Sequence, residues 1–133
     1  MTMTDPVSDL LTRVRNAAKA KKNAVDIPAS NLKREIVRIL TEHKYLKDVV
    51  ELPDNKQGIL RVYISYTRED KSVLNGLERI SRPGLRKYYD AEEVRMSTFN
   101  TRGLMIVSTS QGIMTNFDAA SKGIGGEALC RCW

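Results

Sequence analysis

The chain has 133 residues, of which 41% are hydrophobic and 29% charged, with a formal net charge of +6 and a pI of about 9.5. This length allows one ordinary domain or two very small ones, and the composition excludes a disordered chain. The positive charge favours a polyanionic partner, because each neutralised phosphate releases condensed counterions. Residues 1–66 carry 12 basic and 8 acidic side chains and the remainder 10 and 8. Neither part is a basic tail, so a nucleic-acid surface must be built by folding.

The N-terminal part predicts the order helix, strand, helix, strand, strand. Thr4-Asp5-Pro6 is typical of a helix start, and apolar side chains then recur at helical spacing. Val25–Pro28 is expected to be extended, and Ala29-Ser30-Asn31 to cap a second helix. Asp48–Leu52 and Ile59–Tyr66 predict two strands joined by a turn, the second with clear alternation. The apolar stripe of the first helix consists of Val7, Leu10, Leu11, Val14, Ala17 and Ala18.

Basic side chains lie off the apolar stripes of both predicted helices. On the first helix, a solvated face and an RNA-contacting face explain the basic run equally well, since lysines near a helix C-terminus are also favoured by the helix dipole. On the second helix we expect Lys33, Arg34 and Arg38 to point outward.

Thr67–Ser72 is polar and highly charged, which predicts a linker between an N-terminal domain of residues 1–66 and a C-terminal domain of residues 73–133. The C-terminal part is mostly β. Its first two strands, Leu77–Ser81 and Leu85–Tyr89, flank Arg82-Pro83-Gly84-Leu85, which suits a type II turn. The remaining predicted elements are a short helix over Glu92–Ser97, a strand Leu104–Ser108, a strand at Ile113-Met114, a short helix capped by Thr115 and ended by Gly123, and a strand Ala128–Trp133.

The sequence offers little for catalysis. His43 is the single histidine, and a hydrolase or RNA-modifying enzyme would have to combine it with a distant nucleophile such as Ser110. The glycines of Gly123-x-Gly125-Gly126 precede a strand, whereas a phosphate-binding loop normally opens a helix. We therefore expect no catalytic residue, no cofactor and no small-molecule substrate.

Cys130 and Cys132 are two residues apart, which places them on one face of a strand and poorly for a disulfide with each other. A metal site would need further ligands that the sequence does not supply. We interpret them as strand-filling thiols in a reducing compartment. Residues 1–6 contain no apolar leader segment, and no stretch approaches 18 apolar residues, so we expect a cytoplasmic protein with no membrane partner.

The segment Ser108–Gly112 predicts an RNA-contacting loop. Three consecutive hydroxyl residues followed by Gln111 are costly to bury without partners, and Gly112 allows another backbone to approach closely. Hydroxyl, amide and main-chain groups suit the 2′-hydroxyls and base edges of the A-form minor groove. An ordinary Ser/Thr turn is the alternative interpretation. Arg86 and Tyr88 add a cation and a stacking surface nearby.

Five segments in chain order carry a family resemblance: Thr4-Asp5-Pro6 with Thr12-Arg13-Val14-Arg15-Asn16, Ile27–Lys33, Ile80–Arg86, Ser108–Thr115, and Gly125–Cys130 with Trp133. In these segments the chain closely resembles bacterial-type small ribosomal subunit protein eight, the uS-eight family, nearly end to end. The resemblance implies an α+β fold of two small packed domains. It also implies a structural ribosomal protein that binds the central domain of small-subunit ribosomal RNA and acts early in subunit assembly.

The resemblance further implies neighbouring small-subunit ribosomal proteins as partners, and repression of translation through the messenger of its own operon. The alternative is a general RNA-binding or RNA-modifying protein outside the ribosome, and a protein-only adaptor would lack RNA affinity despite the charge. The RNA-binding residues that the resemblance implies are Thr4, Asp5, Arg13, Arg15, Asn16, Lys33, Lys56, Arg86, Tyr88, Ser108, Thr109, Ser110, Gln111, Gly112, Gly126 and Glu127, with Tyr88 and Glu127 as supports of the loop.

The chain departs from the family pattern at three places. Gln111 stands where a lysine is common, which removes one phosphate contact and is expected to reduce the log–log salt slope by somewhat under about one unit. Met96–Gly103 is less family-like, and the ending after Cys130 is more basic than usual.

Overall fold

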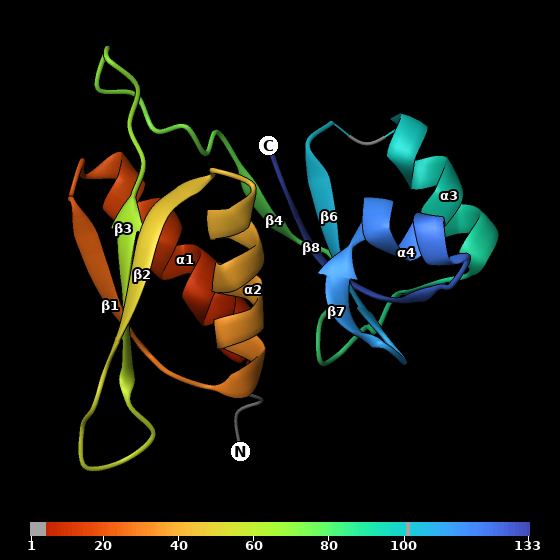
Figure 1. The fold of residues 1–133 in the computed structure, drawn as a ribbon, viewed down its shortest axis with the longest axis horizontal. Coiled ribbons are helices and arrows are strands. Elements are labelled where there is room, and N and C mark those ends of the chain that lie inside the picture. The colour runs from red at the N-terminus through yellow and green to blue at the C-terminus, as the bar shows by residue number, and fades with distance from the viewer. Residues whose placement is uncertain (1–4, 101) are drawn as a thin grey trace. The chain divides into compact units, whose positions relative to one another are not determined.

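The computed structural model describes residues 5–100 and 102–133. Its contacts divide the chain into two units, Pro6–Gly76 and Leu77–Trp133, with Asp5 belonging to the second. Each unit combines helices with an antiparallel sheet, which confirms the predicted α+β class (Figure 1). The domain limits that the sequence suggested, with a linker at 67–72, stay a prediction. No helix in the described part of the chain is both long and apolar enough to span a membrane.

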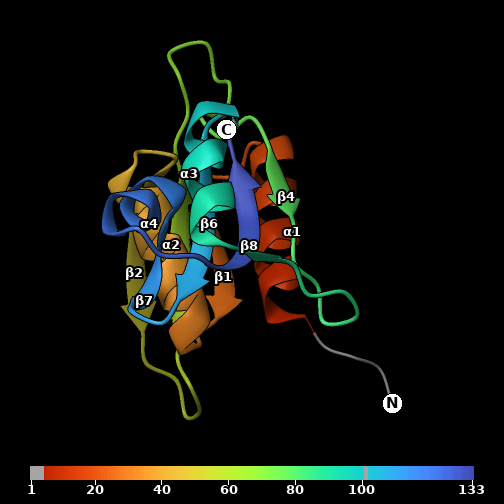
Figure 2. The same ribbon diagram turned by 90° about the vertical axis from the view of Figure 1, so that its right-hand side faces the viewer.

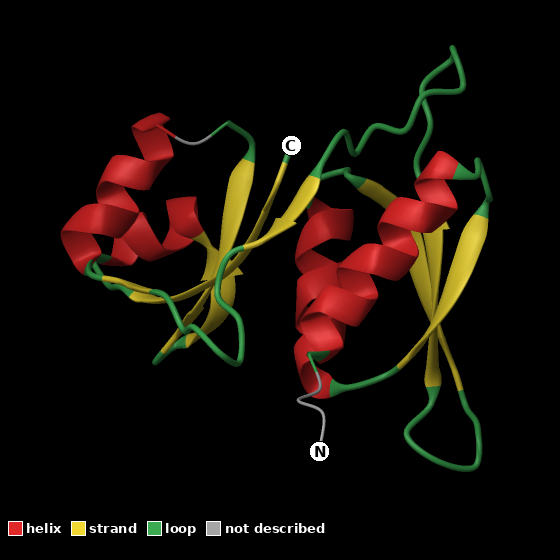
Figure 3. Cartoon of the chain, turned by 180° about the vertical axis from the view of Figure 1, so that it is seen from behind, coloured by secondary structure: helices red, strands yellow, loops and turns green. Residues whose placement is uncertain are grey.

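The unit Pro6–Gly76 is a three-stranded sheet with two helices on one face (Figures 1 and 3). The sheet order is β1-β3-β2, with both pairings antiparallel. Amphipathic spacing explains the helices, since the apolar stripe predicted for α1 is buried from Val7 to Ala17, and only Ala18 at its end is partly exposed. Its elements are α1 (Pro6–Lys19), β1 (Ala24–Pro28), α2 (Asn31–Glu42), β2 (Leu46–Leu52) and β3 (Ile59–Ile64).

Three details of this unit differ from the sequence expectations. β3 ends at Ile64 and not at Tyr66, which forms only an isolated bridge with Ser72. β2 begins at Leu46 instead of Asp48, because a bulge between these residues lets Leu46 pair with Ile64. Lys33 was expected to point outward, and this is wrong: its side chain is buried, and its ammonium donates a hydrogen bond to the Pro28 carbonyl at 3.0 Å. The first turn of α2 lies over the corner where β1 ends, so the lysine stem covers the core there.

The unit Leu77–Trp133 is a five-stranded sheet with two helices (Figure 2). Its order is β4-β8-β6-β7, and β5 also pairs with β8. Val94 of α3, Met114 of β7 and Ala119 of α4 form an apolar cluster against which Tyr89 packs. Its elements are β4 (Leu77–Arg79), β5 (Tyr88–Tyr89), α3 (Ala91–Asn100), β6 (Leu104–Thr109), β7 (Gly112–Thr115), α4 (Asn116–Lys122) and β8 (Gly126–Cys132).

The turn before β5 is not of type II. Arg82 and Leu85 exchange backbone hydrogen bonds as expected of a tight turn, but the φ of Gly84 is not positive, as a type II turn requires at that position. After the turn only Tyr88-Tyr89 pairs with the sheet. The predicted strand from Leu85 is therefore too long, and the Leu85 side chain is 65% exposed.

Helix α3 runs from Ala91 to Asn100 and is longer than the six residues predicted; a capping box fixes its start. The Glu93 N–H donates to the Asp90 carboxylate at 2.8 Å, and the Asp90 N–H donates to the Glu93 carboxylate at 3.2 Å. The caps predicted for α4 are confirmed: the Thr115 hydroxyl accepts from the Asp118 N–H, and Gly123 ends the helix with a φ of 68°.

Cys130 and Cys132 are free thiols with fully buried side chains. Burial raises the pKa of each to about 12. Both therefore stay protonated at neutral pH and pack as small apolar groups, as the sequence pattern suggested.

Candidate nucleic-acid interface

The segment Ser108–Gly112 is the tight connection between β6 and β7. Thr109 pairs with Gly112 in the antiparallel register, leaving Ser110 and Gln111 at the tip, both exposed. The Thr109 hydroxyl donates to the Gly112 carbonyl at 2.7 Å and accepts from the Gln111 N–H at 3.1 Å. Thr109 thus shapes the loop from inside.

The hydroxyls of Ser108 and Ser110 differ from that of Thr109 in their hydrogen bonding. Within the described residues, neither hydroxyl forms an intramolecular hydrogen bond. Gly112 has a φ of 113°, and a Cβ there would meet nothing within 4 Å. Its glycine is therefore required by backbone conformation and not by the close approach of another segment. The loop presents two hydroxyls with unused hydrogen-bonding capacity next to open space.

Two glycines set the position of this loop. A Cβ on Gly126 would lie 2.2 Å from the Ser108 carbonyl oxygen, and one on Gly125 would lie 2.2 Å from the Tyr89 carbonyl oxygen. These residues allow β8 to run between β5 and β6 at close range. The paired glycines Gly125 and Gly126 therefore serve sheet packing, and this is the role of Gly126 among the predicted site residues.

Glu127 stands beside the loop and is surrounded by donors. It is opposite Ser108 in the β6–β8 register, and its carboxylate accepts from the Ser81 hydroxyl and from Arg86 at 3.0 Å. Burial opposes its ionisation, but the Ser81 hydroxyl, Arg86 and Arg79 outweigh burial and hold the pKa of Glu127 below its usual value. Glu127 is thus an ionised anchor that also raises the pKa of Arg86.

Tyr88, Glu127, Ser108 and Ile113 are in register across four neighbouring strands, so they share one face of the sheet. Tyr89 packs against the helices on the other face, and Tyr88 is 69% exposed. Tyr88 and Tyr89 therefore lie on opposite faces of the sheet. The structure thus brings Arg86, Tyr88 and Glu127 together with the Ser108–Gly112 loop.

A buried polar link that the sequence analysis missed holds the base of the loop strands. Asn116 is fully buried; its side-chain oxygen accepts from the Met105 N–H and its amide donates to the Ser97 hydroxyl, both at 3.1 Å. These bonds connect the start of α4 to β6 and to α3. An asparagine next to the Thr115 cap was the available signal, but helix N-terminal positions favour it for several reasons.

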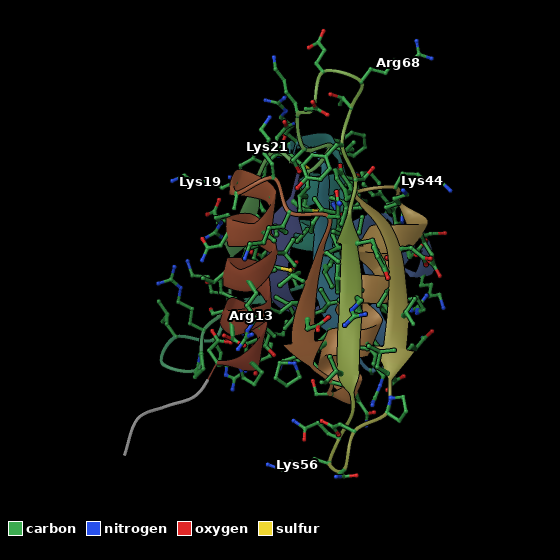
Figure 4. All side chains as sticks on the ribbon, turned by 90° about the vertical axis from the view of Figure 1, so that its left-hand side faces the viewer. Arg13, Lys19, Lys21, Lys44, Lys56 and Arg68 are labelled. Atoms are coloured by element: carbon green, nitrogen blue, oxygen red, sulfur yellow. The ribbon has the colours of Figure 1, made fainter. Side chains whose placement is uncertain are left out.

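The site residues predicted in the N-terminal part are scattered over separate elements. Arg13, Arg15 and Asn16 are exposed on α1, and Arg13 forms an ion pair with Asp9. Lys56 is exposed in the turn between β2 and β3, as Figure 4 shows.

The other RNA-binding residues predicted in the N-terminal part are Lys33, Asp5 and Thr4. Lys33 is buried. Asp5 forms an ion pair with Arg79 at 3.1 Å in the second unit, where both side chains are largely buried. Thr4 lies outside the described residues.

The residues that the sequence analysis weighed for metal binding and catalysis can be placed in the described parts of the chain. Among these residues no group of three histidine, cysteine, aspartate or glutamate side chains could hold a metal ion. His43 ends α2, with its backbone N–H bonded to the Ile39 carbonyl, and it belongs to a different unit from Ser110.

The comparisons with known proteins agree over the length of the chain. A family model described as "Ribosomal protein S8" matches residues 5–133. Proteins called "Small ribosomal subunit protein uS8" match over 133 residues, covering 100% of this chain and 100% of each relative. The identities are 49% for Natranaerobius thermophilus, 48% for Acetivibrio thermocellus and 47% for Geobacillus kaustophilus.

Proposed function

The chain belongs to the ribosomal protein S8 family, and from this premise we propose that it binds the central domain of small-subunit ribosomal RNA directly and early in subunit assembly. Its relatives identify it as a structural protein of the small ribosomal subunit. Its partners are accordingly ribosomal RNA and neighbouring small-subunit proteins. We include in the proposal a cytoplasmic location within the ribosome and repression of its own operon messenger, through an RNA structure like the ribosomal one.

The observation that carries the proposal is the Ser108–Gly112 loop. The main chain that carries its two hydroxyls, which form no intramolecular hydrogen bond among the described residues, is held by the β6–β7 register and by the close approach of β8 at Gly126. Fixed hydroxyl and main-chain groups suit the wide minor groove of A-form RNA, where 2′-hydroxyls and base edges are accessible and the shape is read. Tyr88 on the same sheet face offers an aromatic surface for an unstacked base.

The exposed basic side chains of Pro6–Gly76 complete the proposal. Arg13 on α1, Lys22 after it and Lys56 in the β2–β3 turn are solvent-accessible cations. Such groups bind phosphates and contribute affinity without sequence information. In this proposal the loop provides the specificity, and both the loop and the basic side chains contribute to affinity.

The test is a filter-binding titration of the purified protein against a central-domain RNA fragment, with an unrelated hairpin as control, at several salt concentrations. Preference for the fragment by a factor of about 10³ or more, the low end for specific complexes in the analogous DNA case, supports the proposal. Equal and weak binding to both RNAs contradicts it.

Two substitutions separate the roles of the loop and the basic surface. Ser110→Ala removes one exposed hydroxyl and should weaken the fragment about tenfold while leaving the generic hairpin unchanged. Lys22→Ala should weaken both RNAs about equally and flatten the salt slope. A loss from Ser110→Ala that is the same for both RNAs would refute the loop assignment.

A further inference from the structure

Resting on the proposed function, we propose that Lys122, at the end of α4, supplies the cation of the Ser108–Gly112 loop and binds an RNA phosphate there, with Gln111 as its positioning residue. The loop itself contains no charged side chain. Hydroxyl contacts alone would give this site no counterion release and hence no salt dependence of its own.

The contact that supports this assignment joins α4 to the loop tip. The Lys122 ammonium lies 3.5 Å from the Gln111 side-chain oxygen, and both side chains are exposed. Asp118 precedes Lys122 by four residues on α4, a spacing at which ion pairs form readily. Lys122 nevertheless forms no ion pair with Asp118 or with any other carboxylate of the described chain. The ammonium therefore lies against the loop tip, with no carboxylate of the described chain competing for it.

Two other basic residues of the predicted site, Arg86 and Lys33, are less available to a phosphate. Arg86 is paired with Glu127 at 3.0 Å, so a phosphate must compete with a carboxylate for its guanidinium. Lys33 is buried and bonded to a carbonyl group. An ammonium has three donor hydrogens, and Gln111 uses one, which leaves Lys122 two donors for phosphate oxygens.

The main chain on both sides of the contact leaves room for RNA. Gly112 follows Gln111 and Gly123 follows Lys122, and a Cβ on either glycine would meet nothing within 4 Å. A phosphate can therefore reach the ammonium without displacing a side chain at either position. The amide oxygen of Gln111 restricts the lysine to this space, which reduces the entropy lost when the phosphate binds.

The experiment measures the affinity of the full chain for the central-domain fragment between 50 mM and 200 mM salt. Lys122→Ala should weaken binding about two- to fivefold and make the log–log salt slope shallower by about 0.8 unit. Gln111→Lys in the Lys122→Ala background should restore the slope, because the cation returns to the same place. Gln111→Ala should reduce affinity but keep the slope, as expected of a positioning residue.

Arg102→Ala is the matched control. Arg102 is exposed in the same unit and precedes the opposite end of β6, about 17 Å from the loop at the usual strand rise. It should leave the slope unchanged. A Lys122→Ala slope equal to that of wild type, or a Gln111→Lys revertant that fails to restore it, overturns the inference.

The outcome separates this inference from the proposed function. If wild type does not prefer the fragment over the unrelated hairpin, the proposed function fails first. If wild type prefers it and Ser110→Ala reduces the preference about tenfold, while Lys122→Ala behaves like Arg102→Ala, only the role of Lys122 is refuted.

Discussion

The Ser108–Gly112 loop and the basic surface of Pro6–Gly76, meaning its exposed lysine and arginine side chains, present different kinds of RNA-binding chemistry. The loop is uncharged, and the main chain that carries its hydroxyls is positioned by pairing with neighbouring strands. The basic surface consists of long exposed side chains, such as Lys19 and Lys56 in Figure 4, whose ends are positioned by few contacts. A site set by the main chain depends on residues that never touch the ligand, whereas a site made of flexible cations depends on each cation separately.

This contrast predicts that the substitutions most damaging to RNA binding by the loop are in the neighbouring strand β8 and not in the loop itself. Gly126→Ala places a Cβ 2.2 Å from the Ser108 carbonyl oxygen, a distance that the sheet can relieve only by separating β8 from β6. We expect a loss of about 3 kcal/mol or more in the free energy of unfolding, with loss of specific RNA binding. Urea denaturation and fragment titration measure both.

Gly84→Ala is the control for the loss of a glycine. A Cβ there meets nothing within 4 Å, and the φ of Gly84 is not positive. It should change stability by less than about 0.5 kcal/mol. If Gly126→Ala is equally mild, the loop is not positioned by strand contact, and the comparison with the basic surface loses its basis.

The next largest effect is expected at Asn116. Asn116→Ala removes the acceptor of the buried Met105 N–H and the donor to the Ser97 hydroxyl. Leaving such a group unpaired should cost about 2 kcal/mol, measured by urea denaturation. Hydrogen exchange should show faster exchange of the Met105 amide.

Phe117→Ala is a suitable comparison, because Phe117 is the next residue and is 45% exposed. It should leave the Met105 amide protected. Equal exchange in the two variants would mean that α4 is held to β6 by apolar packing and not by Asn116.

Elements whose structure depends on local interactions could be predicted from the sequence. Helices α1 and α2 and the alternation of β3 followed from hydrophobic periodicity, because one face of each element is buried. The caps Thr115 and Gly123 were predictable because their interactions are local. The hydroxyls of the loop were recognised because three in a row are costly to bury.

Non-local contacts were not predictable in this way. The burial of Lys33 depends on a carbonyl at the end of β1, and periodicity alone places it outside. The link from Asn116 to Met105 joins residues that only the sheet brings together. Lys122 lies 11 residues from Gln111, and its contact follows from the direction in which α4 leaves β7. The capping box of α3 was local and could have been found from Asp90 and Glu93.

A smaller effect on stability should distinguish the Thr109 hydroxyl, which is bonded within the loop, from the exposed Ser110 hydroxyl. Thr109→Val preserves the shape of the side chain but removes two hydrogen bonds, the one that the hydroxyl donates to the Gly112 carbonyl and the one that it accepts from the Gln111 N–H. We expect about 1 kcal/mol of lost stability, and weaker binding of the fragment at unchanged salt slope.

Ser110→Ala should weaken the same RNA with no change in stability, because its hydroxyl has no intramolecular bond among the described residues. Equal stability losses in the two variants would contradict the distinct roles. Urea midpoints and fragment titrations of both proteins, done in parallel, decide the point.

The smallest expected effect is a pH dependence at Glu127. Its pKa is lowered in the folded state, so its contribution to stability is present above the unfolded value of about 4.5 and is lost as the pH falls through the lower folded value. Glu127→Gln should therefore reduce the loss of stability between pH 5 and pH 3, followed by urea midpoints. Ser81→Ala removes one donor that lowers the pKa of Glu127, and should move the acid loss toward higher pH. If neither variant changes the acid dependence, the carboxylate beside the loop is not the anchor, and the position of the loop rests on strand pairing and its glycines alone.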